Sequence, residues 1–126
     1  MVWHKSVLQQ LKESGLFTEV SLTGAKVRAV IDDARFLDIH YDSTTKSYSY
    51  ALIDLSLRYP GDKPLFGWDD YPHECVAEIE RLESYPHHFQ RRGADLRWIF
   101  EASSMRGDIE REIDTVIALL KTYLQR

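Results

Sequence analysis

The sequence is poor in the features that usually indicate a function. A single cysteine, Cys75, excludes an internal disulfide and a cysteine-built zinc site. There is no glycine-rich phosphate loop, no nucleophile elbow and no CxxC pair. No apolar run approaches the roughly 20 residues of a membrane span, and the first residues lack the charged-then-apolar layout of a signal peptide. We therefore expect a cytoplasmic protein without a membrane segment.

The chain also lacks an excess of positive charge. Its 16 lysines and arginines stand against 20 aspartates and glutamates, a formal net charge of −4. Chain-wide binding of nucleic acid normally requires a basic face, so the composition argues against it and leaves only a local basic patch open. With 126 residues, of which 44% are hydrophobic, we expect one globular domain over residues 1–126.

The hydrophobic pattern predicts a helix near each end and strands between them. Helical spacing indicates a helix over residues 1–14 and a longer one from about residue 107 onward. Alternation indicates strands over 17–22, 26–32, 36–42, 47–54 and 65–69, and allows a last one over 96–101. Segment 71–92 stays open between a short helix and an irregular excursion. The expected class is α+β, a curved antiparallel sheet of about five or six strands with helices on one face.

Two segments share an aromatic-Pro-His signature, Tyr71-Pro72-His73 and Tyr85-Pro86-His87-His88. Proline fixes φ and biases the preceding residue toward extended backbone, so each histidine follows a stiff bend. We predict that the two bends form one site. If they do, the ring nitrogens of His73 and of His87 or His88 lie within about 8 Å, a distance that a phosphate bridges.

These histidines suit the cleavage of RNA without a metal ion. The reaction needs a general base, a general acid and a cation for the charge that develops on the phosphate. His73, His87 and His88 are the candidates for the first two roles, because histidine exchanges protons near neutrality. Arg91 and Arg92 are the candidates for the cation.

Aromatic residues near the bends are candidates for substrate binding. Trp68, Tyr71 and Tyr85 could stack on unpaired bases, a contact worth ~1–3 kcal/mol per base, and Asp69 lies beside them. Trp68 could instead belong to the core, since it alternates with Phe66 on an expected strand. Asp69 could equally cap the turn.

The candidate catalytic residues also have structural interpretations. His73 could brace its loop by binding a backbone carbonyl. Adjacent residues of an extended chain face opposite ways, so at most one of His87 and His88 enters a given site. Arg91 and Arg92 could be a solvated charge pair.

A metal site is the second interpretation of the same segments. Nitrogen and oxygen donors suitable for zinc or manganese are present, although their spacing matches no recurring short ligand motif. The donors are His73, Glu74, His87, His88 and Asp69.

The two segments resemble the TumE family of toxin–antitoxin proteins. In that family a strand ends in Trp-Asp-Asn, a small residue and Pro-His-His follow, and a later Phe-Pro-His-His precedes a basic residue and a further histidine. Here the corresponding stretches are residues 68–74 and 85–90, with a longer insertion between them. Asp70 stands in place of the asparagine, Glu74 in place of the second histidine and Gln90 in place of the last one. The resemblance covers residues 17–124 approximately.

The resemblance implies a toxin that a cognate small antitoxin protein neutralises, with RNA as its target. We therefore expect a toxin of a type II system, an endoribonuclease that uses histidine acid–base chemistry and needs no metal or cofactor. A homodimer stays open. The alternative is a non-enzymatic protein-binding module with a degenerate toxin-like fold, in which the histidines serve packing.

Overall fold

A computed structural model describes residues 3–57, 64–72, 76–95 and 97–125 of the chain. Seven strands and three helices are described. Their order is α1 (Trp3–Glu13), β1 (Glu19–Thr23), β2 (Lys26–Val30), β3 (Arg35–Tyr41), β4 (Tyr48–Asp54), β5 (Pro64–Asp69), α2 (Ala77–Glu80), β6 (His88–Arg92), β7 (Trp98–Ala102) and α3 (Ile109–Leu124).

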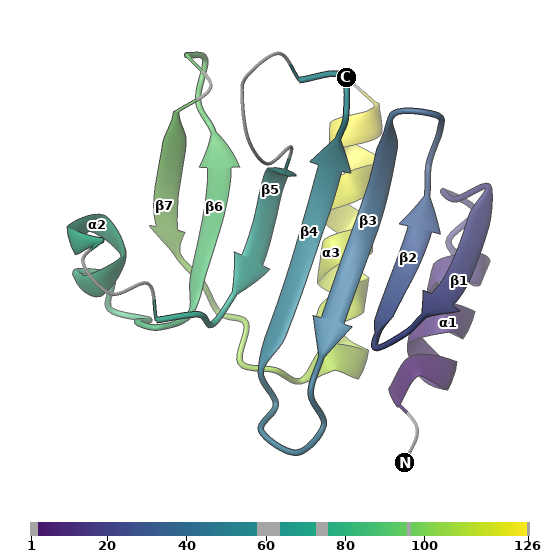
Figure 1. The fold of residues 1–126 in the computed structure, drawn as a ribbon, viewed down its shortest axis with the longest axis horizontal. Coiled ribbons are helices and arrows are strands. Elements are labelled where there is room, and N and C mark those ends of the chain that lie inside the picture. Colours follow the sequence, from purple (N-terminus) through teal and green to yellow (C-terminus); the bar gives the residue numbers. More distant parts are fainter. Residues whose placement is uncertain (1–2, 58–63, 73–75, 96, 126) are drawn as a thin grey trace.

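The strands form one antiparallel sheet in which each strand pairs with the next along the chain (Figure 1). The α+β class with a helix at each end is confirmed, and the described sheet has seven strands, one more than the upper end of the prediction. The additional strand, β6, lies in the segment that the sequence left open. Its residues alternate, but Phe89 is the only apolar one, so the pattern lacked the hydrophobic contrast that identifies a strand.

Two helices, α1 and α3, cover one face of the sheet (Figure 1). In β4 every second residue is buried, and the buried set faces the helices. Leu37 and Ile39 of β3 are fully buried, as are Ile113 and Leu120 of α3. Each such side chain contributes roughly 1.5–3 kcal/mol through removal of its apolar surface from water.

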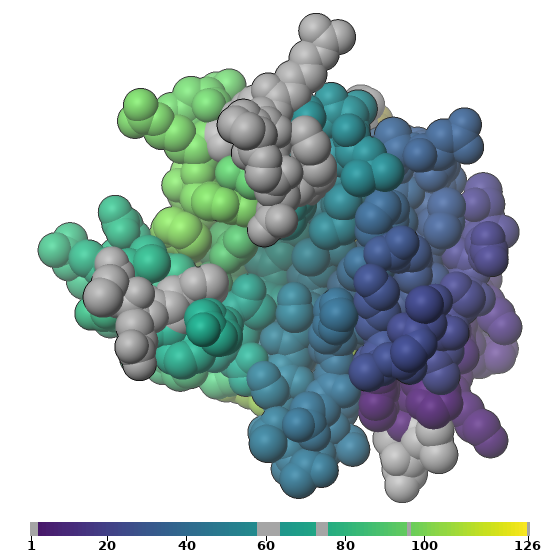
Figure 2. Space-filling view, viewed as in Figure 1, coloured from purple at the N-terminus to yellow at the C-terminus, as the bar shows by residue number. Residues whose placement is uncertain are grey.

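Neither α1 nor α3 lies over the opposite face, which Figure 2 shows with α3 hidden behind the sheet. Side chains on this face pair with one another. Asp38 accepts two hydrogen bonds from Arg28, at 2.8 and 2.9 Å, and its carboxylate is 3.4 Å from Lys26 Nζ. The Arg28 guanidinium also lies 4.0 Å from the ring centre of Phe36.

Tyrosine hydroxyls of β3 and β4 hold the segment that leads into α3. Tyr41 donates to the carbonyl of Gly107 (2.9 Å), and Tyr48 donates to the carbonyl of Met105 (3.1 Å). Tyr50 donates to the buried carboxylate of Glu112 (2.8 Å). The start of α3 is therefore fixed against the middle of the sheet. Within the described chain, no helix combines the length and the apolar character needed to cross a membrane.

Candidate functional site

The described parts of the two aromatic-Pro-His segments lie side by side, because β5 ends where β6 begins. Asp69 is the register partner of His88, and the Nε2 atom of His88 lies 3.2 Å from Asp69 Oδ1. The hydroxyl of Tyr85 donates to the carbonyl of Pro72 at 3.0 Å. The Tyr85–Pro86 peptide bond is cis. One contact thus joins two side chains, and the other is a hydrogen bond to the backbone.

His88 is fully buried. Its Nδ1 atom lies 3.0 Å from the carbonyl oxygen of Pro86, and its Nε2 atom lies 3.1 Å from the amide oxygen of Gln90, besides the contact with Asp69. With both nitrogens facing oxygen acceptors and no exposed surface, the ring orients Asp69 and has no atom free to touch a substrate in this arrangement.

His87 points to the other face of the sheet. Its ring stacks on Tyr48, and its Nδ1 atom lies 2.9 Å from the Tyr48 hydroxyl. That hydroxyl has one proton, which the Met105 carbonyl accepts, so Nδ1 of His87 is the donor of this bond. Burial, and then the positive charge of Arg106, lower the pKa of His87. The two adjacent histidines therefore do not share a site.

His73, together with Glu74 and Cys75, lies outside the described residues. The predicted distance between His73 and His87 or His88 therefore stays a prediction. The described part of this bend ends at Pro72, the residue that accepts the hydrogen bond from Tyr85.

The two arginines of β6 lie on opposite faces of the sheet, since successive strand residues alternate. Arg91 is on the helix-bearing face, where its Nε atom donates to Glu101 at 2.5 Å. Arg92 shares the face of His88, but its guanidinium rests 3.5 Å from the Trp98 ring centre and its Nε atom donates to the carbonyl of Pro64. At about 3.3 Å per residue, Arg92 lies about 13 Å along the strand from His88.

Of the candidate stacking residues, the structure buries Trp68 and exposes the two tyrosines. Trp68 packs in the core against Phe66 and Phe89, with ring centres 5.9 and 4.9 Å away, which resolves its alternatives in favour of the core. Tyr71 is 65% exposed and Tyr85 is 41% exposed. Their rings remain accessible to a ligand beside the junction of the two segments.

A surface hollow of about 610 Å³ adjoins this junction. The strand register creates it: His40 is opposite Ser49, and Ser49 is opposite Asp69, so these side chains form a row that continues to His88. Asp69 accepts a hydrogen bond from the backbone N–H of Tyr71 at 3.0 Å, and 22% of its side chain is exposed. The hollow is lined by Ala25, His40, Tyr41, Asp42, Ser47, Tyr48, Ser49, Asp69, Asp70, Tyr71 and Pro72.

Two residues that depart from the TumE pattern have structural partners. Asp70 accepts from the Ser47 hydroxyl at 2.9 Å and from the backbone N–H of Tyr48 at 3.3 Å. Both are acceptor roles that an asparagine side-chain oxygen also fills. Gln90 occupies the Nε2 side of His88. The side chains at 70 and 90 are therefore both held by hydrogen bonds within this chain.

Over the described ranges, no group of three or more histidine, cysteine, aspartate and glutamate side chains is placed to hold a metal ion. His73 and Glu74, two of the five proposed ligands, are not among those residues. A metal site formed by the five donors would therefore have to include His73 or Glu74, and it stays a prediction.

No protein-family model, curated protein or solved structure matches the chain. The candidate site consequently rests on its own geometry and on the sequence resemblance.

The sequence did not identify the residues that β3 and β4 contribute to the hollow. In the sequence, His40 alternates with Asp38 and Asp42 along an expected strand, a pattern typical of a polar strand face, and Ser49 carries no signal. Their proximity to Asp69 follows from the pairing of β3, β4 and β5, because Asp69 is 29 residues from His40 and 20 residues from Ser49 along the chain. The sequence signal that could have indicated this proximity is the short connections between consecutive strands, which are typical of hairpins and therefore of neighbouring strands.

Proposed function

We propose that this chain is the toxin of a toxin–antitoxin pair and that it cleaves RNA where β5 meets β6. The observation that carries the proposal is the contact of Asp69 with His88, which joins the two segments on which the family resemblance rests. The Tyr85–Pro72 hydrogen bond supports it, because it ties together the two bends themselves.

The roles in our proposal differ from those of a simple histidine pair. In our proposal the partly exposed carboxylate of Asp69 takes the proton of the ribose 2′-hydroxyl, and His73 gives a proton to the departing 5′-oxygen. His88 is a positioning residue, since it touches Asp69 and is itself buried. Tyr71 and Tyr85 offer exposed rings to flanking bases.

The roles of the other candidates change accordingly. His87 has no part in this chemistry, because it faces the other side of the sheet and binds Tyr48. Arg92 is too far along β6 to reach the reacting phosphate and would contact the RNA backbone further along, while Arg91 is paired with Glu101 on the helix-bearing face.

The test is the incubation of the purified protein with single-stranded RNA in EDTA. We expect cleavage by the wild type and a loss of about 100-fold or more in rate for Asp69→Asn and for His73→Ala, the scale of a lost acid–base group. Asp95→Asn makes the same chemical change at an exposed residue that pairs only locally with Arg97, and should retain full activity. Intact RNA after incubation with antitoxin-free wild type would overturn the proposal.

A second candidate, a protein-binding module without nuclease activity, is favoured by the charge of the hollow. Three aspartates line it, Asp42, Asp69 and Asp70, and its described lining contains no lysine or arginine. Such a surface repels phosphate. If this candidate holds, the double variant His73→Ala/His87→Ala changes stability but leaves the effect of expression on cell growth unchanged.

A further inference from the structure

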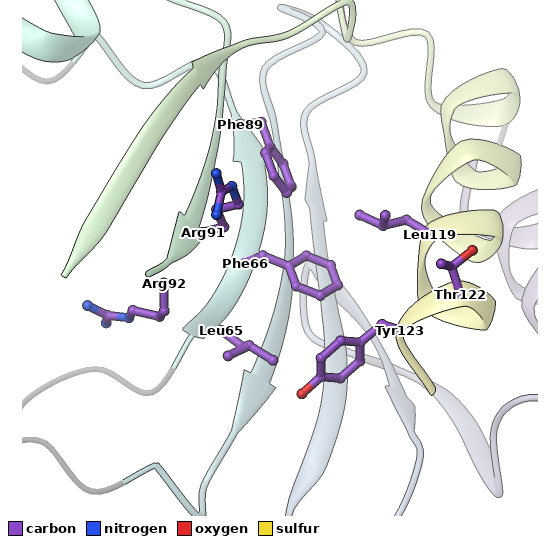
Figure 3. A pocket seen from close by; sticks show the side chains of 8 residues that line it. All are labelled: Leu65, Phe66, Phe89, Arg91, Arg92, Leu119, Thr122 and Tyr123. Carbon is purple, nitrogen blue, oxygen red and sulfur yellow. The ribbon is translucent and has the colours of Figure 1, made fainter. Parts of the chain in front are cut away.

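A groove on the helix-bearing face separates α3 from the far strands of the sheet (Figure 3). Leu65 and Phe66 of β5 and Phe89 of β6 form one wall, and Leu119 and Tyr123 of α3 form the other, around a volume of about 340 Å³. The Phe66 ring lies between Phe89 and Tyr123, with ring centres 6.0 and 5.7 Å away.

The helix layer is narrower than the sheet it covers. Seven strands about 4.8 Å apart span about 29 Å between the edge strands, whereas two helices about 10 Å wide cover only about 20 Å. α1 and α3 lie directly beside each other, since Gln10 of α1 donates to the carbonyl of Glu110 in α3 at 2.7 Å. Of the described helices, none lies behind β6 and β7 (Figure 1). The uncovered strip is about as wide as one helix.

The surfaces that border this strip carry uncharged side chains on α3 and an exposed isoleucine on β7, and the charges on the strip itself are those of the Arg91–Glu101 pair. Along α3, Thr115, Leu119 and Thr122 follow one another at helical spacing, and the last two line the groove. Asp114 is on the side of α3 that faces α1. On β7, Ile99 is 37% exposed and shares the helix-bearing face, as the register partner of Arg91. Depletion of charge at the centre of a patch is a compositional mark of protein interfaces.

The charged residues that line the groove are both arginines, Arg91 and Arg92. Arg91 is at the rim and 47% of its side chain is exposed, while Arg92 points away from the cavity (Figure 3). Arg91 pairs with Glu101, which is equally exposed, and the guanidinium has further N–H donors that can bind an incoming carboxylate.

We propose that an amphipathic helix of a partner protein occupies this groove, with an apolar stripe against Phe66, Phe89 and Leu119 and an acidic residue beside Arg91. Such a helix completes the helix layer next to α3. Its apolar side chains at positions i, i+3 or i+4, and i+7 insert into the groove. The inference does not depend on RNA cleavage, since the groove is on the face opposite Asp69 and His88.

The test selects ligands from a phage-displayed library of helical peptides, with the full-length protein as bait. We expect the enriched peptides to carry an apolar stripe at helical spacing flanked by aspartate or glutamate. Thr122→Glu places bulk and negative charge in the groove and should weaken the synthesised consensus peptide about tenfold or more. Ala118→Glu makes the same change of charge on the exposed side of α3, one turn away, and should leave affinity unchanged.

Three outcomes would overturn the proposal. The first is no enrichment, the second is enrichment of basic peptides, and the third is a consensus that binds wild type and Thr122→Glu equally. A wild-type dimer that Thr122→Glu dissociates, measured by sedimentation, would instead assign the groove to a second copy of this chain. Thermal unfolding of both variants checks that each is folded. Retained RNA cleavage in Thr122→Glu keeps this test separate from that of the proposed function.

Discussion

Glu112 is a buried carboxylate with three donors around it. Tyr50 donates its hydroxyl proton, and the backbone N–H groups of Arg106 and Gly107 donate at 2.7 and 3.2 Å. A buried charge is costly unless it is paired and hydrogen-bonded, and here the partners come from the chain just before α3 and from the centre of the sheet. The same arrangement keeps Tyr50 neutral, because burial and the negative charge of Glu112 raise its pKa well above the usual value.

Substitution of Tyr50 tests the raised pKa of this buried phenol, because the pKa makes the stability of the protein depend on pH in the alkaline range. Since the folded-state pKa of Tyr50 is raised, its contribution is fully present below the unfolded-state pKa of about 10 and is lost as pH rises above it. The lost proton of the unfolded chain costs about 1.4 kcal/mol per pH unit. Tyr50→Phe lacks this phenol and therefore lacks this loss. Above pH 10 we expect its free energy of unfolding to fall less steeply with pH than that of the wild type, by about 1.4 kcal/mol per pH unit.

Urea unfolding at several values above pH 10 measures the two slopes. Tyr71→Phe, a change at a ring that is 65% exposed, controls for the loss of one phenol from the surface. Equal slopes for wild type and Tyr50→Phe would contradict the burial of the phenol beside a carboxylate.

At the scale of elements, the start of α3 depends on close contact with the hairpin between β3 and β4. Gly107 has φ of +85°, and a Cβ atom there would meet the carbonyl oxygen of Lys46, which itself has φ of +62°. A glycine is required at this position for two reasons, the left-handed backbone and the lack of space.

Gly24 separates the two reasons. It also has positive φ, +63°, but a Cβ atom there would meet nothing within 4 Å. We expect Gly24→Ala to lower the free energy of unfolding by about 1 kcal/mol, the cost of the backbone conformation alone. Gly107→Ala should lower it by about 3 kcal/mol, because the hairpin must also move. Chemical denaturation measures both, and equal losses would mean that the contact with Lys46 is not tight.

At the scale of the whole molecule, the strands of the sheet are buried to different extents. β4 lies in the centre, with alternate residues buried, whereas no residue of β7 is buried. Strands with few buried contacts and exposed hydrogen bonds open locally at lower free energy than the core does.

Hydrogen exchange under native conditions should therefore separate the strands. We expect the amides of β3 and β4 to exchange only through global unfolding, and those of β7 to exchange through local opening at a lower free energy. The measurement is amide exchange by NMR across a range of low urea concentrations. Uniform protection from β3 to β7 would contradict the uneven cover. Slower exchange in β7 on addition of the selected peptide would connect the same strands to the groove.

The sequence by itself determined the two long helices and the first five strands, together with the faces of those strands. Leu37 and Ile39 are buried in the sheet face that packs on α3, and Asp38 points the other way, as the alternation predicted. These features are local, because the period of side-chain direction along a strand or helix depends only on backbone geometry.

Only the tertiary structure decided the candidate site. The pairing of Asp69 with His88 does not follow from spacing alone, and β6 was identified only by its pairing with β5 and β7. The separation of His87 from His88 follows from their adjacency once they lie on an extended segment, but that this segment is extended was decided by the fold. The burial of His88, the core position of Trp68 and the row from His40 to Asp69 have the same origin. Each depends on which strands are neighbours and in which register. That is set by the joint packing of residues distant in sequence, which no single stretch of the chain encodes.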